Sequence, residues 1–297
     1  MSDTTASLRR KISSAGDLQS VVRSMKALAA SSIGQYEQSA RALADYYRAV
    51  ELGLSICFRK NAPVVPMTEG KGRTAGEDSI GAIVFGSDQG LVGQFNDVVA
   101  DFAVKTLAAL PGKPQVWAVG ERVHARLSDA GLPLVGIFVV PNSVEAITPL
   151  VGQILVESET SHSQGAVTEL HLFYNRPTAG AGYEPVTQRL LPLDDGWRRK
   201  LAELPWPTQN LPEVIGDNTA TLRALISEYL FVSLFRACAE SLASENASRL
   251  AAMQRADKNI DELLESLNGS FHRLRQSGID EELFDVISGF EALNNKA

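Results

Sequence analysis

The most informative absence in this sequence is that of proline from both ends of the chain. None of the thirteen prolines precedes Pro63, and none follows Pro212. Proline costs roughly 3 kcal/mol in the interior of a helix, so long helices exclude it. This distribution predicts two long terminal helices on either side of a proline-rich middle segment.

Long apolar runs, a secretory leader and closely spaced cysteines are also missing. The longest strongly apolar stretch, near Tyr229–Phe235, is far shorter than the ~20 residues that a membrane-spanning helix needs. The N-terminal segment has no apolar run, so it is not expected to be a secretory signal. Cys57 and Cys238 lie far apart in the sequence, which fits a reducing, cytoplasmic setting. Any work at a membrane would therefore depend on partner proteins.

Excess positive charge is absent overall, but the two ends differ in sign. The net charge of −7 implies no general affinity for nucleic acid. Residues 1–62 carry nine Lys or Arg against five Asp or Glu, whereas residues 213–297 carry eight against fourteen. Helices of opposite charge can lie against each other, although exposed ion pairs contribute only about 0–1 kcal/mol each.

Both proline-free ends carry apolar residues at alternating spacings of three and four, which is typical of a coiled coil. In the N-terminal ladder two steps of four adjoin at Tyr36–Ala40, and such a stutter is expected to unwind the supercoil locally. The C-terminal ladder has Asp257 as its polar step. The N-terminal ladder comprises Leu18, Val22, Met25, Ala29, Ser32, Tyr36, Ala40, Leu43, Tyr47, Val50, Leu54 and Cys57, and the C-terminal one Leu250, Met253, Asp257, Ile260, Leu264, Leu267, Phe271 and Leu274.

The expected length of these helices indicates how they are covered. A helix of about 55 residues is roughly 80 Å long, more than an ordinary globular domain can bury. The two ends are therefore predicted to pair with each other as a long antiparallel coiled coil. The alternative is a bundle of shorter helices broken at glycines, for example at Gly16, Gly34, Gly53, Gly269 and Gly278.

The middle of the chain alternates short apolar runs with helical stretches, which predicts a largely parallel sheet in a Rossmann-like α/β domain. Segments 61–77 and 194–217 have the composition of mobile linkers. The predicted divisions are an N-terminal coiled-coil helix at 1–62, an α/β domain at 78–195 and a C-terminal coiled-coil helix at 217–297. Strands are expected at 80–85, 114–119, 134–140, 170–174 and 186–192, and helices at 96–110, 120–130 and 144–157.

A glycine cluster, Gly86, Gly90 and Gly93, follows the first of these strands, where a phosphate-binding loop would lie. Its spacing matches neither a dinucleotide nor a P-loop fingerprint, and no lysine follows. Asp88 would face an anion rather than attract one. Glycines that only permit a tight strand-to-helix turn explain the pattern better, with Asn96 as a candidate cap of the next helix. No nucleotide or other cofactor is therefore expected on this chain.

Positive signals for catalysis or metal binding are missing. None of the four histidines lies at metal-ligand spacing from another histidine or from a cysteine. No nucleophile, base and acid stand together locally, although a triad can assemble from distant positions. We therefore predict no catalytic residue and no metal site. The four histidines are His124, His162, His171 and His272.

The C-terminal stretch Ser244–Leu293 resembles the C-terminal helix of gamma subunits of F-type ATPases. The family signature there is matched by Ile279, Glu282, Asp285 and Gly289, while Asp280 replaces the usual threonine and Phe290 the usual alanine. Other matches are Ser244, Glu245, Ala252, Met253, Asn259, Leu263, Arg275, Gln276 and Ile287.

The resemblance extends over nearly the whole chain. Residues 23–31 are similar to the N-terminal segment of the family, with Met25 among the matches, but the basic residues that usually follow are replaced by IGQYEQ. SDQGLVGQFN, YNRP and VTQRLLPL are similar to family segments of the middle domain. The differences from the family, namely the IGQYEQ segment, Asp280 and Phe290, favour a divergent branch of the alternate bacterial type.

The resemblance implies a non-catalytic rotor shaft that couples ion flow to ATP synthesis or hydrolysis. Its partners would be the alpha and beta subunits of the catalytic ring, the epsilon subunit and the membrane c-ring, at the cytoplasmic face of a bacterial inner membrane. Met25 would lie near the lever region of beta, Arg275 and Gln276 at a catch loop, and Ile287 and Phe290 in an apolar sleeve, with Glu282 a further contact. Such a shaft would favour a different nucleotide state at each catalytic site in each orientation.

Two other functions stay open at this point. The α/β domain alone would suit a nucleotide-binding or small-molecule-binding protein, which predicts saturable binding by the isolated chain. The helices alone would suit a coiled-coil scaffold or adaptor, which predicts no effect on a ring of alpha and beta subunits. The matches near both termini argue against each.

Overall fold

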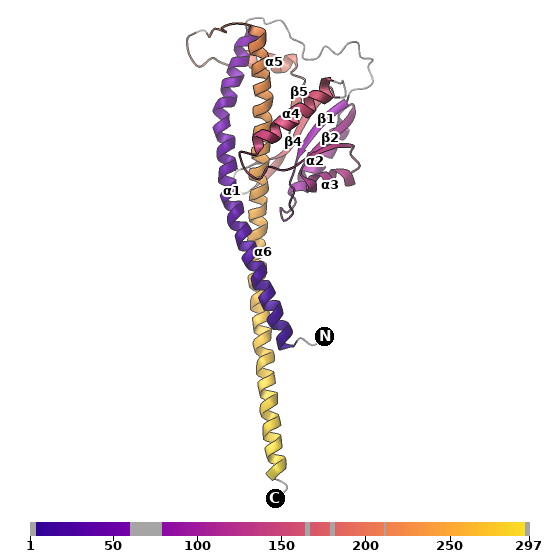
Figure 1. The fold of residues 1–297 in the computed structure, drawn as a ribbon, viewed down its shortest axis with the longest axis vertical. Coiled ribbons are helices and arrows are strands. Elements are labelled where there is room, and N and C mark those ends of the chain that lie inside the picture. The colour runs from indigo at the N-terminus through magenta and orange to yellow at the C-terminus, as the bar shows by residue number, and fades with distance from the viewer. Residues whose placement is uncertain (1–3, 60–78, 164–166, 179–181, 211, 295–297) are drawn as a thin grey trace. The chain divides into compact units, whose positions relative to one another are not determined.

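The computed structural model describes residues 4–59, 79–163, 167–178, 182–210 and 212–294. Its two longest elements are the helices α1, Thr5–Arg59, and α6, Asn218–Asn294, neither of which is broken at a glycine (Figure 1). The contacts of the chain define two compact units: unit 1 comprises Met1–Ala29 and Leu250–Ala297, and unit 2 comprises Ala30–Arg249. The two long terminal helices are confirmed, whereas the predicted domain limits at 62, 78, 195 and 217 stay a prediction.

Unit 2 contains the predicted α/β fold, built on a five-stranded sheet in the order β3-β2-β1-β4-β5. Neighbouring strands from β3 to β4 are parallel, and β5 runs antiparallel to β4. The alternation of strands and helices in the sequence therefore predicted both the mixed class and the largely parallel sheet. The strands are β1 Ser79–Phe85, β2 Lys113–Val119, β3 Leu134–Phe138, β4 Glu169–Pro177 and β5 Tyr183–Leu191.

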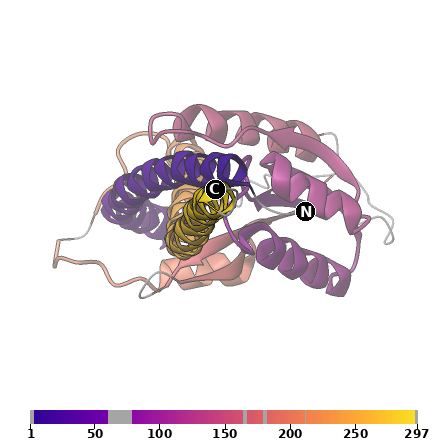
Figure 2. The same cartoon turned by 90° about the horizontal axis from the view of Figure 1, so that it is seen from below.

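Helices cover both faces of this sheet, as Figure 2 shows in a second view. The side chains of β1 alternate between the faces, so Ile83 and Phe85 pack with α4, Ile147–Ser163, while Ala82 and Val84 pack with α2 and α3. Residues of α6 also belong to the core on the α4 face. Helix α2 spans Phe95–Ala109 and α3 spans Glu121–Asp129.

The linker predicted at 194–217 is wrong in its first part, because this segment begins with the helix α5, Asp195–Ala202. Asp194 caps this helix and accepts a hydrogen bond of 2.8 Å from the backbone N–H of Trp197. The Trp197 ring packs against Tyr229 at 5.1 Å between ring centroids. An aspartate cap followed by an apolar anchor was the missed signal. The other predicted linker, 61–77, lies outside the described residues.

The N-terminal ladder is corrected in its first part. Leu18, predicted to lie in the seam, is 60% exposed, whereas every other member of the predicted ladder is buried or half-buried. The buried Gln19 takes the place of Leu18, and Lys26 and Ile33 are half-buried beside Met25 and Ser32, so a regular three-and-four ladder also runs through Tyr36–Ala40, and the stutter stays a prediction. The C-terminal ladder is confirmed, since each of its members is buried or half-buried. The observed α1 ladder is Leu8, Ile12, Ala15, Gln19, Val22, Lys26, Ala29, Ile33, Tyr36, Ala40, Leu43, Tyr47, Val50, Leu54 and Cys57.

Candidate functional site

The glycine loop after β1 is closed by its own hydrogen bonds. The backbone N–H of Ser87 donates to Asn96 Oδ1 at 3.0 Å, and Asn96 Nδ2 donates to Ser87 Oγ at 2.8 Å. At Gly86, a Cβ atom would lie 2.3 Å from Cβ of Val123, so glycine is needed there for close packing of the turn against α3. The loop therefore serves to join β1 to α2 tightly.

Asp88 lies where a bound anion would have to lie. Its Oδ1 accepts from the backbone N–H of Glu121 at the start of α3, and its Oδ2 accepts from the backbone N–H of Val140, both at 2.9 Å. A helix N-terminus attracts negative charge, and here the carboxylate of the chain itself supplies it. The arrangement ties together the loops that follow three strands and gives a nucleotide phosphate no free N–H at these two positions.

The predicted role of Asn96 as a helix cap is wrong. Helix α2 begins at Phe95, its N-cap residue is Gln94, and no side chain bonds to the cap. Asn96 lies in the first turn and its side chain is committed to Ser87. Asparagine is a common cap, but this one stabilises the glycine loop from inside the helix.

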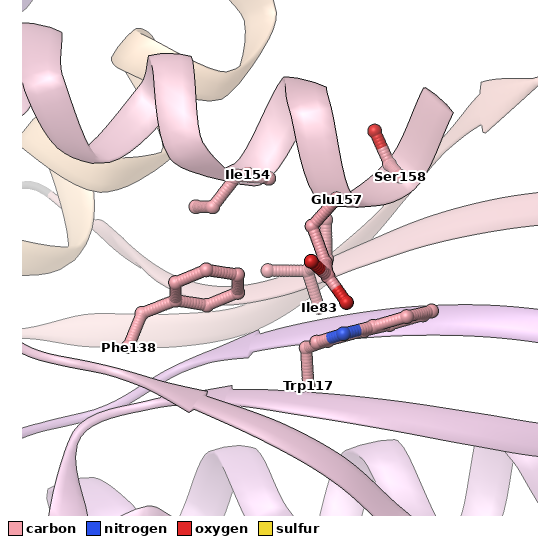
Figure 3. Close-up of a pocket in the computed structure, with 6 residues that line it drawn as sticks. All are labelled: Ile83, Trp117, Phe138, Ile154, Glu157 and Ser158. Atoms are coloured by element: carbon pink, nitrogen blue, oxygen red, sulfur yellow. The ribbon is translucent and has the colours of Figure 1, made fainter. Parts of the chain in front are cut away.

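A small pocket lies between the sheet and α4 (Figure 3). Ile83, Trp117 and Phe138 line it from the sheet, and Ile154, Glu157 and Ser158 line it from α4, with the Glu157 carboxylate directed toward Trp117. The space is too tight to admit a water molecule. Among the described residues Trp117 Nε1 has no hydrogen-bond partner. This pocket therefore offers no volume for a substrate or cofactor.

The part of the chain that the structure describes holds no group of three or more His, Cys, Asp or Glu residues that could bind a metal ion. Within the same residues, no helix is both long enough and apolar enough to cross a membrane. His171, one of the four histidines, is paired with Glu169 at 3.1 Å within β4.

A buried ion pair joins two consecutive turns of α6 in unit 2. Glu245 and Arg249 are 2.6 Å apart, with side chains only 7% and 12% exposed. Burial raises the pKa of Glu245, and the charge of Arg249 opposes this rise. The second oxygen of Glu245 and Nε of Arg249 have no further partner among the described residues. Each charge of this pair therefore depends on the other.

Nearby, α6 is fastened to the glycine loop. Ser248 Oγ donates to the backbone oxygen of Val92 at 2.5 Å, and Ser244 Oγ donates to the backbone oxygen of Asn175 at 2.9 Å. Both serines are buried. The segment Ser244–Arg249, which begins the family-like C-terminal stretch, thus holds the helix against β4 and the loop after β1.

In unit 1, α1 and α6 run antiparallel and are joined by a polar layer centred on Asp257. Lys26 Nζ lies 2.7 Å from Asp257 Oδ2, Arg23 Nε lies 3.1 Å from Oδ1, and Gln19 Nε2 donates to Oδ1 at 3.4 Å. The hydrogen bond from Lys26, followed by that from Arg23, lowers the pKa of Asp257. Gln19 also donates to Asp261. The polar step of the C-terminal ladder therefore meets polar steps in the N-terminal one.

Unit 1 also exposes two apolar surfaces. On α1, Leu18, Val21 and Leu28 are 56–68% exposed, and with the half-buried Met25 they follow a 3-4-3 spacing that places them on one side of the helix. We call these four residues the outer stripe. The second surface, the tip surface, is formed near the end of α6 by Ile279, Leu283, Phe284, Val286 and Ile287, each 45–69% exposed.

The residues predicted to contact partners all lie in unit 1. Met25 belongs to the outer stripe and Ile287 to the tip surface, whereas Arg275, Gln276 and Glu282 are exposed on α6. The backbone of Phe290 is part of α6, but its side chain lies outside the described residues. The structure thus groups Met25 and Ile287 with exposed apolar neighbours and shows no contact that joins Arg275, Gln276 and Glu282 to one another.

Sequence reasoning missed most of these apolar neighbours. Leu18 was assigned to the buried seam, although its spacing to Val21, Met25 and Leu28 was visible and would have defined the outer stripe. Leu283, Phe284 and Val286 were not among the residues predicted to contact partners. Three and four residue spacing identifies an apolar side of a helix but does not show whether that side is buried.

The family model described as ATP synthase matches residues 4–293, and the chain therefore belongs to this family.

Curated relatives are matched over nearly their full length. The chain is 26% identical to an ATP synthase gamma chain of Moorella thermoacetica, over 96% of this chain and 98% of the relative. It is 29% identical to an ATP synthase gamma chain of Clavibacter sepedonicus, with 96% of each chain covered.

Solved structures show the same fold. A rotor chain of the Euglena gracilis mitochondrial ATP synthase matches with a TM-score of 0.61 at 14% identity, over 93% of this chain and 98% of that one. A central-stalk and c-ring structure from Tetrahymena thermophila contains a chain that matches with a TM-score of 0.55 at 21% identity, over 80% of this chain and 99% of that one.

Proposed function

We propose that this chain is the gamma subunit and central rotor shaft of an F-type ATP synthase, and that it is not itself catalytic. The observation that carries the proposal is the match of the family model over residues 4–293, supported by gamma chains aligned along their whole length. The rotor chain of a solved ATP synthase shares the fold. In this function the chain turns inside a ring of alpha and beta subunits and couples ion flow to ATP synthesis or hydrolysis.

The exposed surfaces of unit 1 support its insertion into such a ring. Soluble chains seldom expose clustered apolar side chains, and such patches mark interaction sites. We infer that the tip surface, with Ile287 and Phe290, lies in an apolar sleeve of the ring. We infer likewise that the outer stripe, with Met25, faces the lever region of beta.

Exposed polar residues of α6 supply the second kind of contact in this proposal. Arg275, Gln276 and Glu282 point into solvent on the described chain and are available to another subunit. Arginine forms forked hydrogen bonds with carboxylates and with backbone oxygens, which suits a specific catch. We assign Arg275 and Gln276 to contact with a catch loop of the ring.

Other partners and the location of the complex follow from the same proposal. The remaining partners are the epsilon subunit and the membrane c-ring, and unit 2 supplies the surface for them. The complex lies at the cytoplasmic face of a bacterial inner membrane, and the chain is held there through its partners. We infer from departures such as Asp280 and Phe290 that it belongs to a divergent, alternate bacterial branch.

The catch assignment is tested with the double variant Arg275→Ala plus Gln276→Ala in a ring reconstituted from candidate alpha and beta subunits. Loss of charge-assisted hydrogen bonds costs about 1.5–3 kcal/mol, so a roughly tenfold or larger loss of ATPase rate, with lower torque, is expected. The matched control is Gln254→Ala plus Arg255→Ala, the same pair of residue types exposed elsewhere on α6. Wild-type rate and torque in the first variant reject the catch.

A further inference from the structure

Helix α1 carries two overlapping ladders in unit 1, and the less apolar of them lies in the seam. The apolar ladder is Leu18, Val22, Met25 and Ala29. In the structure Gln19 is 9% exposed and replaces the 60% exposed Leu18, while Lys26 is half-buried beside the half-buried Met25. Burial of apolar surface alone favours the first, because leucine and methionine gain more from leaving water than glutamine and lysine. Some other interaction must therefore turn α1 toward the second.

Asp257 supplies that interaction. It is the polar step of the α6 ladder, its side chain is 13% exposed, and a carboxylate at such a position must be paired. Lys26 and Gln19 donate to it at 2.7 and 3.4 Å, and the more exposed Arg23 adds a third donor at 3.1 Å. With Leu18 and Met25 in the seam, these donors would be drawn away from the carboxylate.

We propose that Asp257 is a positioning residue that fixes the rotation of α1 about its own axis in unit 1. Polar residues inside coiled-coil seams are known to select one arrangement of helices over apolar competitors. By holding Gln19 and Lys26 against α6, Asp257 turns the exposed members of the outer stripe, Leu18, Val21 and Leu28, outward. The rotation of α1 is argued from the contacts within unit 1 alone. That the outer stripe faces a ring of alpha and beta subunits rests on the proposed function.

The orientation is measured by the reactivity of an engineered thiol on the full-length chain. Ser14 is exposed and lies one turn before Leu18 on the same side of α1, so Ser14→Cys reports whether that side is outward. Ser13→Cys, on a side of α1 away from both ladders, is the reference. Cys57 and Cys238 are buried, so they stay silent in the folded chain.

Replacing the Asp257 carboxylate is expected to slow the reaction of the thiol at position 14 and to leave that of the thiol at position 13 unchanged. In the Asp257→Leu chain, the Ser14→Cys thiol reacts about tenfold more slowly with a thiol reagent, because access governs reactivity. The Ser13→Cys thiol keeps its rate. Asp261→Leu is the matched control: Asp261 also contacts Gln19 and Arg23, but its side chain is 60% exposed and outside the seam, so both thiols keep their rates.

A rescue variant separates reorientation from unfolding. Adding Gln19→Leu and Lys26→Leu to Asp257→Leu makes the observed ladder apolar, so it again competes for the seam, and the Ser14→Cys rate returns to that of the parent. Equal rates at Ser14→Cys with and without Asp257 overturn the proposal, as does a slow thiol that the rescue variant does not restore. No ring is present in this assay, so its outcome is independent of the proposed function.

Discussion

Replacing Arg249 by alanine is expected to lower the free energy of unfolding of unit 2 by about 3–5 kcal/mol, because it leaves Glu245 buried without its counter-charge. The pair lies at 2.6 Å and both side chains are nearly inaccessible. All three tryptophans of the chain belong to unit 2, so tryptophan fluorescence during urea unfolding reports on the relevant part.

The pH dependence of this loss identifies its cause. Burial already raises the pKa of Glu245 in the native chain, and removal of the opposing arginine raises it further. The folded state then binds a proton more tightly than the unfolded state, so stability falls as pH rises above the unfolded pKa of about 4.3. The loss in Arg249→Ala is therefore smaller at mildly acidic pH than at neutral pH.

Two further variants serve as controls for this prediction. Glu245→Gln added to Arg249→Ala removes the buried charge and should abolish the extra pH dependence. Glu245→Met with Arg249→Met replaces the pair by apolar side chains of similar length and should recover most of the stability, since buried pairs seldom exceed apolar packing. An Arg249→Ala chain as stable as the parent at neutral pH contradicts this account of the pair.

The second large effect is expected at Gly120, where alanine should destabilise unit 2 by about 4 kcal/mol, combining strain at positive φ with overpacking. Gly120 has φ of +115°, and a Cβ atom there would lie 2.7 Å from the backbone carbon and oxygen of Ser87. The backbone cannot easily retreat, because the N–H of Gly120 donates to the oxygen of Phe138 at 2.9 Å.

Gly131→Ala provides the matched control for this collision. Gly131 also has a positive φ, +76°, but a Cβ atom there would meet nothing within 4 Å. Its substitution should cost only about 1–2 kcal/mol, the ordinary penalty of a left-handed conformation. If urea unfolding gives equal losses for the two variants, the close approach of Gly120 to the Ser87 loop is not what requires glycine.

The long helices and the sheet were predictable because each depends on residues that lie close together in the sequence. Absence of proline predicted α1 and α6, and alternation of apolar runs with helical stretches predicted the sheet. The observed orientation of α1 was missed, because Leu18 and Gln19 are adjacent and the choice between them depends on Asp257, more than 230 residues away in the sequence. Periodicity contains no information about such a partner.

The candidate sites show the same limit. The sequence showed that the glycine loop lacks a nucleotide fingerprint. Only the structure shows that Asp88 takes the place of an anion there, because it accepts hydrogen bonds from the backbone N–H groups of Glu121 and Val140. Glu282 and Ile287 were predicted as partner contacts from the family resemblance, whereas the apolar exposure of Phe284 and Val286 required knowledge of how far α1 accompanies α6. Contacts between distant segments decide these features.

The measurement that most directly tests the central proposal is rotation of this chain inside an assembled ring. Candidate alpha and beta subunits are co-purified with the full-length chain and fixed to a surface, and a probe on an exposed residue of unit 2 is followed during ATP hydrolysis. The proposal predicts co-assembly and one-way rotation of the probe with threefold stepping. An assembled ring that hydrolyses ATP while the probe stays still, or a ring that never retains the chain, would contradict it.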